Sequence, residues 1–327
     1  IEDVESGEDI NTSLDKFERS TEATEAEEAS GTLGEIMSEI FNEVDGGKPI
    51  DKTLTGIPIV DECTNGLAKG ELVTIGAKSG KGKSALAIRM AVNMFREDKK
   101  VLIVSREMSK KQIGERILLA HSGVTKENYE KRTLSETDWV RIVETTEAFN
   151  TDQIIIDDKI ATIPEIKQAV RKHKPDMLIV DYVQLLTPTN PRDSRERQVA
   201  DMSRELKKMT SDFDMIVVQL TQLAEKGIGN YRPHGESYPR ESRAIYHDSN
   251  LVIYVHHVEE EKEIQIAYNS TAVKERMSLH QFEEMLKRFD DNDTRLMELI
   301  VDKNRSGTVG SKFYWFSGSE MSYFPVL

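Results

Sequence analysis

The sequence predicts an α/β fold in which helices flank a mostly parallel sheet that ends in an antiparallel C-terminal edge. Between residues 71 and 220, short apolar runs alternate with amphipathic segments of helical length, a pattern typical of βαβ units. Beyond residue 250 the apolar runs have few helical segments between them, although the charged segment 259–295 interrupts them, and we expect antiparallel strands there. A glycine-rich basic turn between the first run and the first helix is the third indication.

The individual elements follow from apolar runs and from helical spacing. The expected strands are 72–76, 101–105, 154–156, 177–181, 215–220, 251–255, 296–301, 312–316 and 321–324. The expected helices carry apolar residues three and four positions apart, and they are 85–95, 112–120, 134–149, 163–173 and 198–213. The charged segment 259–295 matches neither pattern well, and we assign it no structure.

The composition excludes several classes of protein. Hydrophobic residues make up 38% of the 327 residues, which is too many for a wholly disordered chain. No run approaches the ~18 apolar residues of a membrane helix, and the N-terminal region lacks the basic and apolar regions of a signal peptide. Cys63 is the only cysteine, so a disulfide framework and a multi-cysteine zinc site are excluded. We therefore expect a cytoplasmic protein without a membrane partner.

The negative charge is concentrated near the N-terminus. The net charge is −14, and residues 1–48 hold 15 acidic residues against 3 basic ones. The remainder is nearly neutral and can carry a local basic groove. We expect an acidic, disordered tail over 1–31, a linker helix and connection over 32–53, and one main domain over 54–327.

The linker region contains one amphipathic helix. Its apolar residues have helical spacing, with Thr32 as the expected N-cap and Gly46 at the expected end. The apolar positions are 33, 36, 37, 40, 41 and 44. The helix docks either on its own domain or on a neighbouring subunit, and its residues favour neither.

The stretch 77–84 has the form of a phosphate-binding loop. It ends in Gly-Lys-Ser, with Ala77 where a first glycine is usual, and it lies between an expected strand and an expected helix. The glycines let backbone N–H groups face a triphosphate, and a basic surface turn is disfavoured by this context. We expect ATP to be bound by Ser79, Gly80, Lys81, Gly82, Lys83, Ser84 and Ala85.

Two carboxylates at strand ends complete the predicted site. Asp181 ends an apolar strand, and with the Ser84 hydroxyl it is the predicted ligand of Mg²⁺. Glu107 follows the strand after the phosphate-loop helix, where it can face the γ-phosphate and activate water. Asp157 and Asp158 are alternatives for that role, and we interpret them as solvated carboxylates.

Taken together, several stretches resemble the ATPase domain of hexameric replicative DNA helicases of the bacterial DnaB type, which phages also encode. The matching stretches are 77–84, 105–108 with Gln112 and Arg116, 178–186, 217–223, 240–242 and 303–307. They follow the family order over residues 54–327. The resemblance implies a RecA-like P-loop ATPase core, ATP and Mg²⁺ as cofactors, and subunits that form a six-membered ring.

The resemblance also implies roles that the residues alone leave open. Glu107 would be the catalytic carboxylate, and Gln222 would sense the γ-phosphate. Lys303 and Arg305 would reach the ATP site of the adjacent subunit, where an arginine finger stabilises the transition state; on spacing alone they read as a charged hairpin turn. The helix over 33–44 would dock on the next protomer. The helical N-terminal domain that meets primase is expected to be missing, and a helicase loader is a further expected partner.

Two long polar loops are the predicted contacts to single-stranded DNA. They span 187–198 and 226–243, and loops of this length in a compact domain are usually functional or disordered. In the family such loops line the central channel, whereas a solvated basic loop is the other interpretation. The predicted DNA-contacting residues are Arg195, Arg197, Arg240 and Glu241.

The sequence thus favours an ATP-dependent replicative DNA helicase that moves 5′ to 3′ along single-stranded DNA. A RecA-type recombinase that coats DNA as an ATP-switched filament is the alternative, and a ring ATPase acting on proteins is a third. Lys303 and Arg305, as a finger, together with the linker-like helix favour a ring over a filament, and the basic loops favour DNA over a protein substrate. Arg106 and Arg243 depart from the family pattern, which indicates a divergent member encoded by a bacterium or a phage.

Overall fold

The computed structural model describes residues 31–47, 51–223, 232–235, 243–290, 294–318 and 322–326. The chain separates into two compact units, Ile1–Ile50 and Asp51–Leu327. The predicted DNA contacts Arg240 and Glu241 lie outside the described residues. In the part that is described, no helix has the length and apolar character needed to cross a membrane.

The first unit contains the helix expected from the spacing of apolar residues. Helix α2 (Leu33–Asp45) begins with a capping box, in which Thr32 Oγ1 accepts the Glu35 N–H at 3.3 Å and the Glu35 carboxylate accepts the Thr32 N–H at 2.7 Å. Leu33, Phe41 and Val44 are 74%, 65% and 73% exposed. The helix is confirmed, and its apolar side faces solvent.

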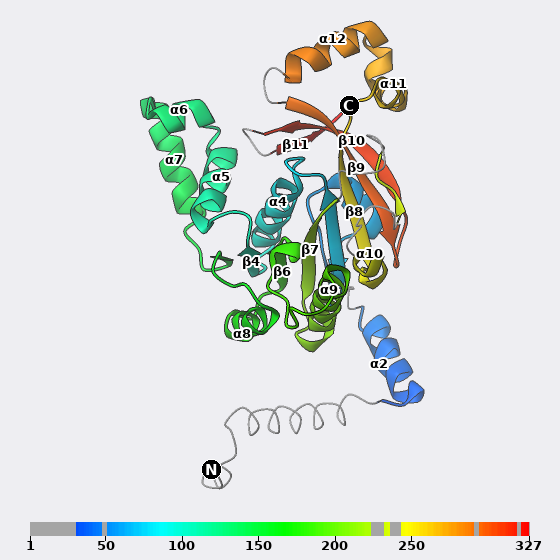
Figure 1. Ribbon diagram of the computed structural model, residues 1–327. Helices are drawn as coiled ribbons and strands as arrows, with labels where there is room; N and C mark the ends of the chain where they lie inside the picture. Colours follow the sequence, from blue (N-terminus) through cyan, green and yellow to red (C-terminus); the bar gives the residue numbers. More distant parts are fainter. Residues whose placement is uncertain are drawn as a thin grey trace. The chain divides into compact units, whose positions relative to one another are not determined.

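The second unit is built on a sheet whose described strands have the order β11-β10-β9-β8-β3-β7-β6-β4-β5 (Figure 1). The strands are β3 (Leu72–Ala77), β4 (Val101–Ser105), β5 (Ile154–Asp157), β6 (Met177–Asp181), β7 (Ile216–Gln222), β8 (Leu251–His257), β9 (Thr294–Asn304), β10 (Gly310–Ser317) and β11 (Ser322–Pro325). The strands from β8 to β5 in this order pair in parallel, whereas β9, β10 and β11 pair antiparallel. A separate antiparallel pair is formed by β1 (Lys52–Thr53) and β2 (Leu67–Ala68). The predicted fold class is confirmed.

Helices cover both faces of the sheet. The described helices of this unit are α3 (Pro58–Thr64), α4 (Lys83–Arg96), α5 (Lys110–Ser122), α6 (Lys126–Lys131), α7 (Glu136–Ala148), α8 (Ile163–His173), α9 (Arg195–Asp212), α10 (Arg243–Asp248), α11 (Glu261–Ser270) and α12 (Leu279–Asp290). Residues of α3, α4 and α5 pack with Ile103 on one face, whereas α8, α9 and α10 pack with Leu102 on the other. This division follows because successive strand residues point to opposite faces.

Strand β8 differs from the prediction. The sequence pattern places 251–255 in the antiparallel edge, but β8 pairs in parallel with β3 and antiparallel with β9. The preceding connection is long and contains α10, and a crossover of a dozen or more residues is what a parallel pair requires. Strand β8 therefore joins the parallel and antiparallel parts of the sheet.

The charged segment 259–295 forms α11 and α12 beside β9 and β10 (Figure 1). The Phe282 side chain is fully buried in a small apolar cluster with Leu296 and Trp315, and the Phe282 and Trp315 ring centroids are 6.0 Å apart. Phe282, Met285 and Phe289 have helical spacing. This spacing is typical of a helix, but the many charged residues around it make the pattern difficult to recognise in the sequence.

Candidate functional site

The phosphate-binding loop has the strand–turn–helix context that its motif requires. Strand β3 ends at Ala77, and α4 begins at Lys83. Gly80 and Gly82 have φ of 70° and 90°, a region that favours glycine. A Cβ on Gly82 would also collide with the Tyr323 hydroxyl of β11, which donates to the Gly82 carbonyl at 3.1 Å. Both glycines are therefore required by the backbone.

Lys83 lies at the centre of a group of charged side chains from separate elements. It is only 6% exposed, and its Nζ forms an ion pair with Glu107, lies 3.4 Å from Asp181 Oδ1 and lies 4.6 Å from the centroid of the Tyr182 ring. Strands β4 and β6 are neighbours, with Ser105 opposite Asp181, so the two carboxylates emerge from the same edge of the sheet. The structure thus brings Lys83, Glu107 and Asp181 together as the sequence predicts.

The surroundings of Asp181 fit a role in binding Mg²⁺. Burial raises the pKa of its carboxyl, and the Lys83 ammonium and the Ser84 hydroxyl partly offset this. Its Oδ1 is buried and receives no hydrogen bond within the described residues. These residues also contain no cluster of metal-binding His, Cys, Asp or Glu side chains. The oxygen atoms of Ser84 and Asp181 suit Mg²⁺, which usually binds one or two protein ligands, several waters and substrate phosphates.

A cleft of about 660 Å³ opens beside Lys83, Ser84 and Glu107. It is large enough for a nucleotide on the scale of small-molecule sites, which span ~300–1,000 Å³. Gly80, Lys83, Ser84 and Glu107 line its inner part, and the Glu107 side chain is 39% exposed. Arg295 and Phe316 of the antiparallel edge line the cleft as well, and the sequence did not single them out. Their place follows from strand pairing, which connects residues far apart in the chain.

Lys81 has a different environment from that of Lys83. Its Nζ lies 2.7 Å from His257 Nδ1 and 2.5 Å from Glu259 Oε1, at the end of β8. Burial and the Lys81 ammonium lower the pKa of His257. The Lys81 side chain is therefore attached to the neighbouring strand, which the sequence did not predict. Its backbone can still contribute to a phosphate cradle.

Gln222 occupies the edge predicted for a γ-phosphate sensor. It ends β7, opposite Ala77 of β3, and the neighbouring Thr221 Oγ1 accepts a hydrogen bond from Gln184 Nε2 at 2.7 Å. The register is compatible with a contact to nucleotide. The sensing role itself stays a prediction.

Lys303 and Arg305 lie at the opposite end of the sheet from the phosphate-binding loop. Lys303 is paired with Val252 at the start of β8, whereas the loop follows the end of β3. Lys303 Nζ donates to the Tyr246 and His247 carbonyls at 2.6 and 3.0 Å, and Arg305 Nη2 donates to the His247 carbonyl at 2.7 Å. Both cations thus bind the last carbonyls of α10, where positive charge is favourable.

The protein-family model of the DnaB-like helicase C-terminal domain matches residues 53–324 of the sequence. The chain belongs to this family. The replicative DNA helicase DnaB of Leifsonia xyli is 31% identical over 68% of this chain and 51% of that protein. The replicative DNA helicase DnaB of Geobacillus stearothermophilus is 24% identical over 93% of this chain and 64% of that protein. The DnaB-like chain thus spans between one half and two thirds of the length of these relatives.

Solved structures support the fold of this DnaB-like domain. A DnaB-like replicative helicase described with its interactions with primase has a TM-score of 0.70 at 24% identity, covering 90% of this chain and 67% of that one. A second solved structure, that of an ATPase domain, has a TM-score of 0.74 at 24% identity and covers 91% of this chain and 100% of that one. At this identity the likeness establishes the RecA-type ATPase fold.

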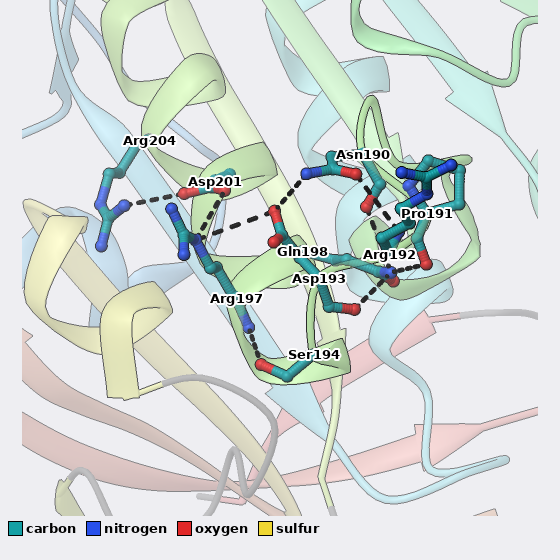
Figure 2. A network of polar contacts seen from close by, with 9 residues as sticks. All are labelled: Asn190, Pro191, Arg192, Asp193, Ser194, Arg197, Gln198, Asp201 and Arg204. Carbon is teal, nitrogen blue, oxygen red and sulfur yellow. Dashed lines mark hydrogen bonds and ion pairs between the residues drawn. The ribbon is translucent and has the colours of Figure 1, made fainter.

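The DnaB-like domain holds Arg195 and Arg197 at the start of α9. Arg195 donates to the Gln184 carbonyl and, at 3.3 Å, to Gln198 Oε1. Arg197 lies 3.8 Å from Asp193 and 4.0 Å from Asp201 and is 70% exposed. Figure 2 shows the Arg197 side chain within a polar network at the loop before α9. Arg197 keeps most of its surface accessible, whereas Arg195 is partly engaged; contact with DNA stays a prediction for both.

Proposed function

We propose that the chain is the motor domain of an ATP-dependent replicative DNA helicase, a ring that translocates 5′ to 3′ on single-stranded DNA and unwinds duplex ahead of it. The observation that carries the proposal is the grouping of Lys83, Glu107 and Asp181 over a nucleotide-sized cleft, in a chain of the DnaB-like family. Names of relatives support the activity, while the ring and the DNA strand belong to the proposal.

The residues of the cleft support hydrolysis of ATP with Mg²⁺. Gly80 to Ser84 offer backbone N–H groups and the start of α4 to the phosphates, and Lys83 offers a positive charge to the β- and γ-phosphates. Bound Mg²⁺ would neutralise charge on the phosphates, with Ser84 and Asp181 as its protein contacts. Glu107 is then released from Lys83 by the competing phosphates and can orient and deprotonate the attacking water.

The sheet register favours completion of the site by a neighbouring subunit. Lys303 is opposite Val252, and Val252 is opposite Thr74, so three residues of β3, ~10 Å, separate this level from the end of the strand at Ala77. Its ammonium points to α10 rather than to the cleft. We therefore assign Lys303 and Arg305 to the nucleotide of the next protomer, with Gln222 as sensor of the γ-phosphate on the same edge as the cleft.

The remaining parts of the proposal concern partners. Helix α2 exposes its apolar side, and we assign it to docking on an adjacent protomer in a hexameric ring. Arg195, Arg197, Arg240 and Glu241 are assigned to single-stranded DNA in the channel. Primase and a helicase loader are the further proposed partners. We place the protein in the cytoplasm of a bacterial cell, where either the bacterium or a phage encodes it.

A RecA-type filament protein that uses ATP only as a switch is the second candidate. Its support is the shared core fold, whereas the exposed apolar side of α2 favours a closed ring. Strand displacement on a forked DNA, measured with and without ATP, beside the mass of the assembled protein, tests the proposal. ATP-dependent unwinding by a six-subunit assembly supports it; DNA coating without unwinding would favour the filament.

A further inference from the structure

Asp302 is an extra residue in the pairing of β8 with β9. Val252 lies opposite Lys303, whereas Ile253 lies opposite Val301, so that Asp302 has no residue across from it. Such a bulge re-aims side chains and is common next to functional sites. Here it directly precedes Lys303, the first of the two cations that we assign to the neighbouring ATP site.

The carboxylate of Asp302 joins two segments that are not adjacent in the sequence. Its Oδ2 accepts the Gly235 N–H at 2.9 Å and the Tyr246 hydroxyl at 3.0 Å. Gly235 has a φ of 60°, and its carbonyl accepts the Tyr254 hydroxyl of β8 at 2.7 Å. Hydrogen bonds to a charged acceptor are roughly twice as strong as neutral ones. One oxygen therefore ties both Gly235 and α10 to β9.

An ion pair between the half-exposed Arg232 and the buried Glu298 attaches the same short segment to β9 a second time. Arg232 Nε and Nη2 donate to the two carboxylate oxygens of Glu298 at 2.7 and 2.8 Å. The Glu298 side chain is 6% exposed, and its Oε1 also accepts the Ser311 hydroxyl at 2.5 Å. This bidentate geometry is both strong and directional. Residues 232–235 are thus fixed to β9 at Glu298 and at Asp302.

Tyr246 of α10 contacts both Asp302 and Lys303. Its hydroxyl donates to Asp302, its carbonyl accepts from Lys303 at 2.6 Å, and Lys303 Nζ lies 5.1 Å from its ring centroid. Arg305 binds the carbonyl of the next residue, His247. A shift of α10 would therefore move the acceptors that orient both cations.

We propose that Asp302 is a positioning residue that couples Gly235 and α10, which flank the proposed DNA contact Arg240 in the sequence, to Lys303 and Arg305. In the sequence, Arg240 lies between Gly235 and Arg243, the first residue of α10. Gly235 binds Asp302 directly, and α10 binds it through Tyr246. A displacement of Gly235 or of α10 would therefore act on the end of β9 through Asp302, and a change at Lys303 and Arg305 would act back on both, as reciprocal coupling requires. This inference rests on the proposed function.

The test measures how strongly single-stranded DNA stimulates ATP hydrolysis in variants of Asp302. The readout is the ratio of turnover with and without a saturating oligonucleotide, since this ratio does not depend on the fraction of active protein. We expect Asp302→Ala to lower the ratio by about tenfold, within the usual ~5–150-fold range of coupling between sites. Asp302→Asn retains an acceptor oxygen and should recover much of the ratio.

Tyr246→Phe provides the second variant, because it removes only one of the two hydrogen bonds to Asp302 and keeps the ring beneath Lys303. Tyr246→Phe should lower the ratio less than Asp302→Ala does. If Asp302→Ala does not fold, a lowered ratio in Tyr246→Phe supports the coupling and an unchanged ratio refutes it. Glu62→Gln is the matched control: Glu62 is an exposed carboxylate paired with Lys312 of β10 at 2.5 Å, and its loss should leave the ratio unchanged.

The outcomes separate this inference from the proposed function. A wild-type protein that neither unwinds forked DNA nor responds to single-stranded DNA refutes the function and the coupling together. A stimulated wild type with equally stimulated Asp302→Ala and Tyr246→Phe variants refutes the coupling alone. If Asp302→Ala lowers the ratio and Asp302→Asn restores it, the positioning role is supported. A general loss of structure would not depend on whether residue 302 keeps an acceptor oxygen.

Discussion

Mixing two inactive variants tests whether the ATP site is shared between subunits. Lys83→Ala removes the buried ammonium of the cleft, and Arg305→Ala removes a cation at the far end of the sheet. Each variant alone should lose nearly all hydrolysis, and the loss for Arg305→Ala should reach ~10³–10⁵ in turnover, as for other arginine fingers. Arg305→Ala should still bind nucleotide, because Arg305 does not line the cleft of its own chain.

The magnitude expected for mixed rings follows from the geometry. In a ring assembled at random from equal amounts, an interface is competent only if one side supplies Lys83 and the other side supplies Arg305. About a quarter of the head-to-tail interfaces meet this condition. If interfaces act independently, the mixture should recover up to that fraction of wild-type hydrolysis, whereas sites completed within one chain would recover nothing.

The assay is steady-state ATP hydrolysis by rings that carry both variants, selected through a different affinity tag on each. Lys312→Ala is the matched control, because Lys312 lies on the same hairpin but forms an exposed ion pair with Glu62. It should keep wild-type turnover. Assembled mixed rings that bind nucleotide yet remain as inactive as the single variants would refute the shared site.

Three further predictions concern single side chains. Glu107→Gln should retain nucleotide binding and lower turnover by ~10²–10⁴, the usual contribution of a general base, as measured by nucleotide fluorescence and by hydrolysis; weakened binding with normal turnover would contradict this role. Arg240→Ala should weaken single-strand binding and reduce the magnitude of the salt slope by about the contribution of one phosphate contact, and an unchanged slope in anisotropy titrations would remove Arg240 from the DNA contacts. Burial lowers the pKa of His257 in the folded protein below its ordinary value of 6.5. As the pH falls, the imidazole is therefore protonated in the unfolded chain before it is protonated in the folded one, and the stability that is fully present above pH 6.5 is lost below it. His257→Gln should make urea stability less sensitive to acidification from pH 7.5 to 5.5, and an equal loss in both proteins would argue against this linkage.

The parallel core could be predicted because its signals are local. Apolar runs of β3 and β6 and the spacing of α8 are complete within a few residues, and the structure reproduces 163–173 and 177–181 without change. The grouping of Lys83 with Glu107 and Asp181 also follows from local rules, since each residue lies at the end of a strand or the start of a helix.

Other features depend on pairing between distant residues, and no local pattern contains them. The attachment of Lys81 to His257 requires β8 to lie beside β3, which the spacing of apolar runs did not indicate. The bulge at Asp302 depends on a register shift that is visible only across two strands. Helix α6 has no buried residue, so it lacks the apolar stripe that predicted helices such as 163–173.

The position of the cations gives the strongest reason to regard a single chain as incomplete. A nucleotide in the cleft would meet Lys83 at the start of α4, whereas Lys303 and Arg305 are bound to the last carbonyls of α10, away from the end of β3. Bringing them to the cleft of their own chain would require separating β9 from β8, which are paired over most of their length. In the proposed head-to-tail assembly, Lys303 and Arg305 of a second copy would reach the cleft without breaking this pairing. A head-to-tail arrangement closes into a ring when the rotation between neighbouring subunits divides the full circle evenly. The proposed sharing of the ATP site and the proposed ring therefore require the same subunit contact.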